Sequence, residues 1–288
     1  LMSRRFCYAV FKVNYPSASA LCWSFMRFAS LGSGSRGNAL IVESAGTRIL
    51  IDCGITLRNL TAGLERLDLA LNDLHAAFIT HEHGDHIKGV KALARKHSLP
   101  VYMTHGTAVK SGCHELPQFT LIDNFSAINI GGLSVQPVVV PHDAREPCQF
   151  VITATINNAE PGELPREKRL GVLTDLGSYT PHVIDAYSNC DAMVLECNHD
   201  VGMLEAGSYP YSLKQRVLGD WGHLSNHQAR NLLSNFNHEK IQWLVVAHIS
   251  QQNNTETLAL EALQDVFPYH ERILVADQDT GFDWLQIS

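Results

Sequence analysis

Residues 81–86 read His81-Glu82-His83-Gly84-Asp85-His86 and place four potential metal ligands within six positions. The preceding residues, 76–80, form a short apolar run that is typical of a buried strand. Two histidines at i and i+2 project to the same side of a strand end, whereas Asp85 and His86 follow a glycine turn and open the next helix. Imidazole and carboxylate ligands suit zinc, manganese or iron. The stretch therefore favours a metal site over a chance meeting of ionisable side chains.

The composition of the chain is that of a globular protein. It has 288 residues, 45% apolar and 18% charged, which is enough for one sizeable core. No run approaches the ~20 apolar residues that a membrane-spanning helix needs, so we expect no membrane partner. Seven cysteines without a CxxC pair indicate neither a disulfide framework nor a zinc ribbon. They favour a reducing, cytoplasmic setting.

Histidine content and net charge narrow the function classes. The chain has 15 histidines, an excess that directs attention to clusters because histidine is the commonest metal ligand. The net charge of −7 argues against a protein that holds nucleic acid by a broad basic face. A polyanionic substrate would have to be captured locally.

The first 25 residues differ from the rest, because they contain basic residues, no acidic residue and no clean periodicity. A signal peptide is the alternative interpretation, but Lys12, Asn14 and Pro16 interrupt the apolar run before it reaches the length of a signal. Met26 stands directly before a strand pattern. We therefore interpret residues 1–25 as a non-native or mis-started extension and residues 26–288 as one hydrolase domain.

Strand and helix patterns alternate from Met26 onward, which predicts sheets covered by helices in a single α/β domain. Residues 272–275 and 281–286 look like a closing hairpin. A helix is also expected where Ile87, Val90 and Leu93 form an apolar stripe. The remaining expected strands are 27–31, 39–44, 48–52, 76–80, 101–104, 133–140, 149–156, 170–174, 192–197 and 243–247, and the remaining helices are 59–67, 181–188, 225–235 and 255–266.

Three further candidate ligands stand where predicted strands end. They are His142 in VVVPHDA, Asp175 in VLTDLG and His248 in VVAHIS. Each alone is more often a turn or hydrogen-bonding residue. Together with HEHGDH, and in this order, they resemble the metallo-β-lactamase fold superfamily, whose signature is HxHxDH.

The resemblance implies a dinuclear site. It implies that His81, His83 and His142 hold one ion, that Asp85, His86 and His248 hold the other, and that Asp175 bridges the two. It also implies that Asp52, in ILIDCG, supports the site without binding metal. In the β-lactamases of the superfamily a cysteine commonly stands where Asp175 stands, and in the flavodiiron relatives a glutamate replaces His83. The remaining candidates are hydrolases of phosphodiesters, thioesters or other esters.

The wider motif set resembles one branch of the superfamily, the YycJ/WalJ-like exonucleases. This branch implies an αββα sandwich of two mixed sheets covered by helices, in class α/β (α+β), and 5′ to 3′ DNA exonuclease activity. The motifs are MRFASLGSGSRGN from Met26, THEHGDHIKGV, PHDAREP, GVLTDLG, LECNHD, GHLSN and AHISQQNN.

Two loops favour a phosphodiester substrate. GSGSRGN at 32–38 offers backbone N–H groups, hydroxyls and a guanidinium as a phosphate cradle, or is only a flexible turn. GHLSN at 222–226 opens a helix whose N-terminus attracts anions, or its polar residues cap that helix. The predicted substrate contacts are Ser33, Ser35, Arg36, Asn38, His223, Ser225 and Asn226.

We therefore expect a dinuclear-metal phosphodiesterase, a DNA exonuclease in which a metal-bridging hydroxide attacks phosphorus. Asp85 and His223 are the catalytic candidates, and the cofactors are two Zn²⁺ or Mn²⁺ ions, with iron also accepted by these ligands. The alternatives are a small-molecule hydrolase on the same site, such as a cyclic phosphodiesterase or a glyoxalase-II-like thioesterase, and a non-catalytic binding protein. The residues alone leave open the metal, the polarity of cleavage, the oligomeric state and the roles of Glu196, His199 and Asp200.

Overall fold

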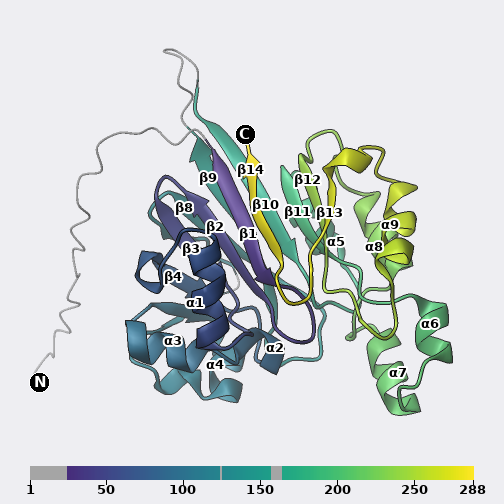
Figure 1. Cartoon of the computed structure of the whole chain (residues 1–288), viewed down its shortest axis with the longest axis horizontal. Helices are drawn as coiled ribbons and strands as arrows, with labels where there is room; N and C mark the ends of the chain where they lie inside the picture. Colours follow the sequence, from purple (N-terminus) through teal and green to yellow (C-terminus); the bar gives the residue numbers. More distant parts are fainter. Residues whose placement is uncertain (1–24, 124, 157–163) are drawn as a thin grey trace, which may run out of the picture.

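The computed structural model describes residues 25–123, 125–156 and 164–288. The expected extension at 1–25 therefore lies, except for Phe25, outside the described residues. Within the described part, two mixed sheets of seven strands each pack face to face, and helices cover their outer faces (Figure 1). The predicted αββα sandwich is confirmed.

The first sheet has the order β14-β1-β2-β3-β4-β5-β6. Strands β1 to β3 are antiparallel, β3 to β6 are parallel, and β14 pairs with β1 in the antiparallel sense. Ala45 and Gly46 join β2 to β3 with φ of 49° and 77°, the left-handed pair that a tight hairpin turn requires. The strands are β1 (Met26–Gly32), β2 (Ala39–Ser44), β3 (Thr47–Ile51), β4 (Ala76–Phe78), β5 (Val101–Met103), β6 (Phe119–Leu121) and β14 (Phe282–Ile287).

The second sheet has the order β13-β12-β11-β10-β9-β8-β7. Strands β7 to β10 are antiparallel and β10 to β13 are parallel, so β8, β10, β11 and β12 all end at the same edge. The strands are β7 (Ile128–Ile130), β8 (Leu133–Val139), β9 (Cys148–Ile156), β10 (Arg166–Leu173), β11 (Ala192–Glu196), β12 (Trp243–Ala247) and β13 (Ile273–Val275).

Helices bury one apolar stripe each against the sheets. Leu60 and Leu64 of α1 and Leu93 of α3 pack on the first sheet, and Val183 of α5 and Leu232 of α8 pack on the second. Helices α6 and α7 lie at the lower right of Figure 1, away from both outer layers. The helices are α1 (Leu57–Arg66), α2 (Gly84–Ile87), α3 (Val90–His97), α4 (His105–Ser111), α5 (Pro181–Tyr187), α6 (Val201–Ala206), α7 (Tyr211–Leu218), α8 (Asn226–Leu233) and α9 (Glu256–Gln264).

The main core lies between the two sheets. Phe78 of β4 is fully buried there, stacks on Tyr102 at 4.7 Å between ring centroids, and meets Phe150 of β9 edge to face at 5.7 Å. Burying one such ring stabilises the fold by about 1.5–3 kcal/mol, and this aromatic cluster joins the two halves. No helix in the described ranges is long and apolar enough to cross a membrane.

The expected closing hairpin is wrong. β13 pairs with β12 in the second sheet, whereas β14 pairs with β1 in the first sheet. A tight turn does stand between them, with Asp277 bridged to Gly281, but its arms diverge into different sheets. The local sequence pattern correctly indicates the turn and the two apolar strands. Long-range packing, which the local pattern does not contain, determines the strands with which they pair.

Candidate metal centre

The candidate ligands stand where strands end. His81 follows β4, His142 follows β8, Asp175 follows β10 and His248 follows β12, while Asp85 and His86 lie on α2. Because these strands end at one edge of the sandwich, side chains from distant parts of the chain meet there. All seven ligands predicted from the sequence fall into two clusters with donor atoms within 4.8 Å of one another.

Three residues of this edge have left-handed backbone conformations. Asp52, Asp175 and His248 have φ of 61°, 56° and 55°. Such conformations cost a non-glycine residue roughly 1–3 kcal/mol and persist only where the surroundings impose them. The backbone N–H of His248, for example, donates to the Ser33 hydroxyl at 3.0 Å. At each of these three residues, the left-handed backbone conformation redirects the chain at the end of the strand, so that the carboxylate or imidazole faces the site.

The first cluster consists of His81, His83 and His142. The Nε2 atoms of His81 and His142 lie 3.0 and 3.2 Å from the Nδ1 atom of His83. One hydrogen on His83 can satisfy only one of these neighbours, whereas a cation would satisfy all three nitrogens. Burial lowers the pKa of His142 to about 4 and lowers the pKa of His81 well below its ordinary value, so both rings are neutral, as metal ligands must be.

The second cluster consists of Asp85, His86, Asp175 and His248. The Nε2 atom of His86 lies 3.2 Å from Asp175 Oδ2, and the Nε2 atom of His248 lies 3.5 Å from an oxygen of Asp85 and from one of Asp175. Asp175 Oδ2 and His248 Nε2 are buried and make no hydrogen bond within the described ranges. A carboxylate oxygen and an imidazole nitrogen can each offer a lone pair, and two such buried atoms without hydrogen bonds fit a metal ion.

The charge of the second cluster calls for a cation. Burial by itself would lower the pKa of His248, but the nearby carboxylates of Asp175, Asp85 and Glu196 raise it to about 10. Burial would raise the pKa of Asp175, but His248 and His86 hold it well below its ordinary value. Without an ion, protons held on His86 and His248 therefore balance the charge of the two carboxylates, and a divalent ion would displace these protons.

Three of the histidines are held by their outward-facing nitrogen. The Nδ1 atom of His86 lies 2.8 Å from Asp52, that of His142 lies 3.0 Å from the carbonyl oxygen of Gly222, and that of His248 lies 3.0 Å from Glu196. Fixing Nδ1 leaves Nε2 to face the site and selects the ring orientation. Asp52 thus lies in the supporting position that the sequence resemblance implies.

Glu196 is a residue whose role the sequence left open and whose contacts lie at the metal centre. Its fully buried carboxylate lies 2.8 Å from His223 Nδ1 and 3.0 Å from His248 Nδ1. Burial would raise its pKa, but the charge and hydrogen bond of His223 lower it to about 2. In turn Glu196 more than offsets burial and raises the pKa of His223. An acidic residue ending the apolar strand AMVLE is the only sequence signal of this role.

Two neighbours of Glu196 have different roles. Asp200 accepts the backbone N–H of Met203 at 2.8 Å and caps α6. His199 is buried, and neither of its ring nitrogens has a hydrogen-bond partner in the described part of the chain. Burial lowers its pKa to about 4, so the ring is neutral.

The loop at 32–38 is turned mostly toward the protein. Ser33 accepts the His248 N–H, as described above, and Asn38 Oδ1 accepts the Gly34 N–H at 2.7 Å. The exposed Arg36 pairs with Asp279 at 3.2 Å. Ser35 alone of the predicted contacts in this loop lines the cavity over the metal centre.

The loop at 222–226 likewise contains residues that form hydrogen bonds within the protein and one residue that lines the cavity. Ser225 caps α8 by accepting the N–H of Gln228 at 3.3 Å, and Asn226 exchanges hydrogen bonds with Asn254 at 2.8 and 2.9 Å. His223 lines the cavity. Of the predicted substrate contacts, Ser35 and His223 line the cavity over the metal centre.

The cavity over the two clusters has a volume of about 380 Å³. The cavity is lined by residues of both clusters, so both open into it, and by His223. Tyr209, Leu213 and Arg216, from α7 and the segment before it, also line it. The site can thus present metal-ligand atoms and the His223 imidazole to one substrate group.

Comparison with known proteins agrees with this geometry. The family described as "Beta-lactamase superfamily domain" matches residues 47–249. The chain is similar to "Exodeoxyribonuclease YycJ" of Bacillus anthracis, at 33% identity over 84% of this chain and 89% of that protein. It is also similar to "Exodeoxyribonuclease WalJ" of Streptococcus pneumoniae D39, at 31% identity over 81% of this chain and 85% of that protein.

Solved structures show the same fold at low sequence identity. The metallo-β-lactamase fold protein YhfI of Bacillus subtilis superposes with a TM-score of 0.67 and 16% identity, over 91% of this chain and 99% of YhfI. A diphosphatase of the PhnP family superposes with a TM-score of 0.61 and 17% identity, over 91% of this chain and 98% of that one. The chain belongs to the beta-lactamase superfamily domain family, and within it to the YycJ/WalJ-like branch.

Proposed function

We propose that this chain is a dinuclear-metal phosphodiesterase that degrades DNA as a 5′ to 3′ exonuclease. The observation that carries the proposal is the pair of adjacent ligand clusters opening into one cavity. The names of the relatives, exodeoxyribonucleases over most of the chain, supply the substrate class. Residues 26–288 would form this hydrolase domain, with residues 1–25 an extension to it.

The ligand assignment follows the clusters. His81, His83 and His142 would hold one Zn²⁺ or Mn²⁺ ion, and Asp85, His86 and His248 the other, with Asp175 between them. When bound, two such ions activate water and neutralise charge on a phosphoryl oxygen. The donor set of imidazoles and carboxylates without a thiolate is compatible with zinc, manganese and iron.

The protein's own groups position the substrate and move a proton. His223 faces the cavity, and Glu196 holds its Nδ1 atom, so Nε2 is the atom that can donate to the leaving oxygen. Asp85 opens α2 beside His86 and supplies a carboxylate oxygen to the same cavity. Ser35 lines the rim, where its hydroxyl can contact the phosphate.

The test identifies the cleavage products of end-labelled substrates from the ladder of fragments that they form. End-labelled DNA and RNA are incubated with the Zn²⁺ and Mn²⁺ forms, and we expect mononucleotides released stepwise from the 5′ end of DNA. Asp85→Asn should abolish cleavage and leave the circular dichroism spectrum unchanged. A metal-loaded protein that cleaves neither nucleic acid, yet hydrolyses a cyclic nucleotide or a thioester, would contradict the proposal and favour a small-molecule hydrolase.

A further inference from the structure

A second cavity adjoins the one over the metal centre. It has a volume of about 390 Å³ and is lined by Glu82, Val109, Lys110, Asp143, Ala144 and Arg145. Asp143 lines both cavities, so they meet at this residue. Lys110 lies near the end of α4, and Arg145 lies in the segment after β8. These two segments thus extend the cavity over the metal centre to one side.

The second cavity offers two cations without partners. Lys110 and Arg145 are exposed, and in the described ranges neither side chain makes a hydrogen bond or an ion pair. Of the two acidic residues in the lining, Asp143 is paired with Arg216. Glu82 Oε1 accepts the backbone N–H of Arg145 at 2.8 Å, and its other oxygen is buried without a hydrogen-bond partner in the described ranges. Two cations against one carboxylate that has no cationic partner among the described residues leave the net charge of the lining positive.

An exposed aromatic residue is anchored by its backbone to Asp143, the residue that the two cavities share. The backbone N–H of Asp143 donates to the carbonyl oxygen of Trp221 at 2.9 Å, which fixes the loop of Trp221 beside the shared residue. The Trp221 residue is 62% exposed, unusual for so large an apolar side chain. Flat aromatic rings beside cationic grooves are stacking platforms for unpaired nucleobases.

We propose that the two cavities form one path for the DNA strand being degraded. Lys110 and Arg145 hold backbone phosphates next to the one at the metal centre, and Trp221 stacks against a base near the strand end. The inference rests on the proposed nuclease function and deepens it by naming the residues that capture the strand. It also explains how a chain of net charge −7 binds a polyanion, since the capture is confined to one groove.

The test measures binding and its salt dependence on metal-loaded protein. The probes are phosphorothioate oligonucleotides of about 20 nucleotides, single-stranded and as a blunt duplex, long enough to span the groove. In Lys110→Gln/Arg145→Gln, the log–log salt slope should fall by about 1.4 for the single strand and about 1.8 for the duplex, the loss expected for two phosphate contacts. Trp221→Ala should weaken binding at least about fivefold.

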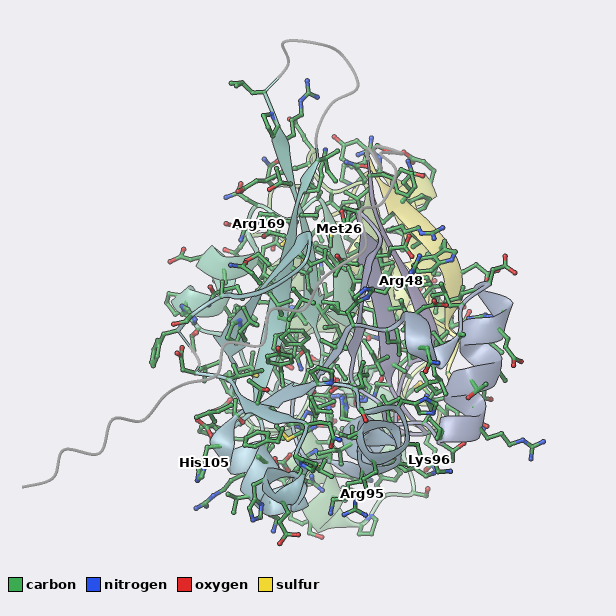
Figure 2. The ribbon with its side chains drawn as sticks, turned by 90° about the vertical axis from the view of Figure 1, so that its left-hand side faces the viewer. Met26, Arg48, Arg95, Lys96, His105 and Arg169 are labelled. Carbon is green, nitrogen blue, oxygen red and sulfur yellow. The ribbon has the colours of Figure 1, made fainter. Side chains whose placement is uncertain are left out.

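Matched control variants remove the same kinds of side chain, two exposed cations and one exposed aromatic ring, at positions outside the proposed groove. Arg95→Gln/Lys96→Gln removes two exposed cations from α3, whose labels lie at the foot of the molecule in Figure 2, outside both cavities. Phe125→Ala removes an exposed aromatic ring from the segment between β6 and β7, none of whose described residues lines either cavity, whereas the loop of Trp221 contributes Gly222 and His223. Both controls should keep the slope and affinity of the wild type. All variants should keep the wild-type turnover of bis(p-nitrophenyl) phosphate, a diester that has no neighbouring phosphate for Lys110 and Arg145 to hold.

The outcomes separate the two proposals. A wild-type protein that degrades DNA, with unchanged salt slope in the double variant and unchanged affinity in Trp221→Ala, overturns the groove and leaves the nuclease standing. Loss of small-diester turnover in a variant together with loss of DNA binding also overturns it, because the substitution then acts through the metal centre. A wild-type protein that neither binds nor cleaves DNA removes the function on which the groove rests.

Discussion

Glu196 shows how one residue organises the site. Its carboxylate contacts the Nδ1 atoms of His223 and His248, which come from a loop and from the end of β12, and its second oxygen accepts the backbone N–H of Leu224 at 3.0 Å. A buried carboxylate is stable only when its acceptor sites are filled, and here the two histidines and the backbone fill them. Glu196 therefore fixes the orientation of a proposed metal ligand and of the proposed proton donor together.

Glu196→Gln should consequently lower activity without removing the metal centre outright. We expect a loss of about 10–100-fold in turnover or metal affinity, the range measured for groups that support ligands. An amide oxygen that accepts from both rings leaves its NH2 group facing the backbone N–H groups of Leu176 and Leu224, and the amide lacks the negative charge that holds the rings. Steady-state cleavage and elemental analysis measure the effect. Glu205→Gln, an exposed glutamate of α6, is the control. Equal activity of the two variants would show that Glu196 does not support the site.

The sequence predicts ligands better than substrate contacts. His142, Asp175 and His248 are recognisable because their order along the chain, together with HEHGDH, resembles the ligand order of a known superfamily, and the structure brings them to HEHGDH. Ser33, Asn38, Ser225 and Asn226 are polar loop residues, and hydrogen bonding within the protein has the same sequence pattern as contact with a ligand. Only three-dimensional packing shows which atoms are already engaged.

At the scale of the element, helix termini explain much of the local structure around the site. Ser225 and Gln228 form a capping box at the start of α8, with the Gln228 side chain accepting the Ser225 N–H at 2.9 Å. This box fixes the loop that carries His223. The longer helices and strands follow from periodicity, whereas β6 and β7, of three residues each, have too little pattern for the sequence to predict them.

Ser225→Ala separates capping from substrate contact. Losing the cap should cost about 1 kcal/mol, a fall of ~2–4 °C in melting temperature for a domain of this size. The KM for DNA should stay at the wild-type value, because the hydroxyl faces the helix. Calorimetry and steady-state kinetics measure both. Ser212→Ala, at an exposed position of α7, is the control for the stability effect. An increased KM with an unchanged melting temperature would restore Ser225 as a substrate contact.

At the scale of the whole molecule, the fold closes through β1. Met26 pairs with Ile287 of β14 on one side and with Ser44 of β2 on the other, and Met26 and Phe28 are fully buried between the sheets. The first sheet is thus complete from Met26 onward. This arrangement is compatible with residues 1–25 being dispensable for folding.

A chain that begins at Met26 should therefore melt at the same temperature and cleave DNA at the same rate as the full chain. A chain that begins at Ala29 loses two buried apolar side chains, worth about 1.5–3 kcal/mol each, together with their strand pairing, and should be strongly destabilised. Thermal denaturation and the cleavage assay compare the three chains. A lower melting temperature for the chain that begins at Met26 would show that the first residues belong to the domain.

The two halves of the molecule also meet in the metal centre. His81 and His83 follow the first sheet and His142 the second, while Asp85 and His86 come from the first half and Asp175 and His248 from the second. Each bound ion would therefore bind the folded chain across the interface between the sheets and have no comparable site on the unfolded chain.

Removing the metal should consequently lower the melting temperature. Free metal at about 1,000 times its dissociation constant stabilises a folded protein by about 4 kcal/mol per site, which chelation would abolish and added Zn²⁺ or Mn²⁺ would restore. Calorimetry before and after chelation, with elemental analysis of the same samples, measures the difference. In His142→Ala, which loses the second-sheet ligand of the first cluster, the response to added metal should be smaller than in the wild type. An unchanged melting temperature after verified metal loss would show that the ions do not tie the two sheets together.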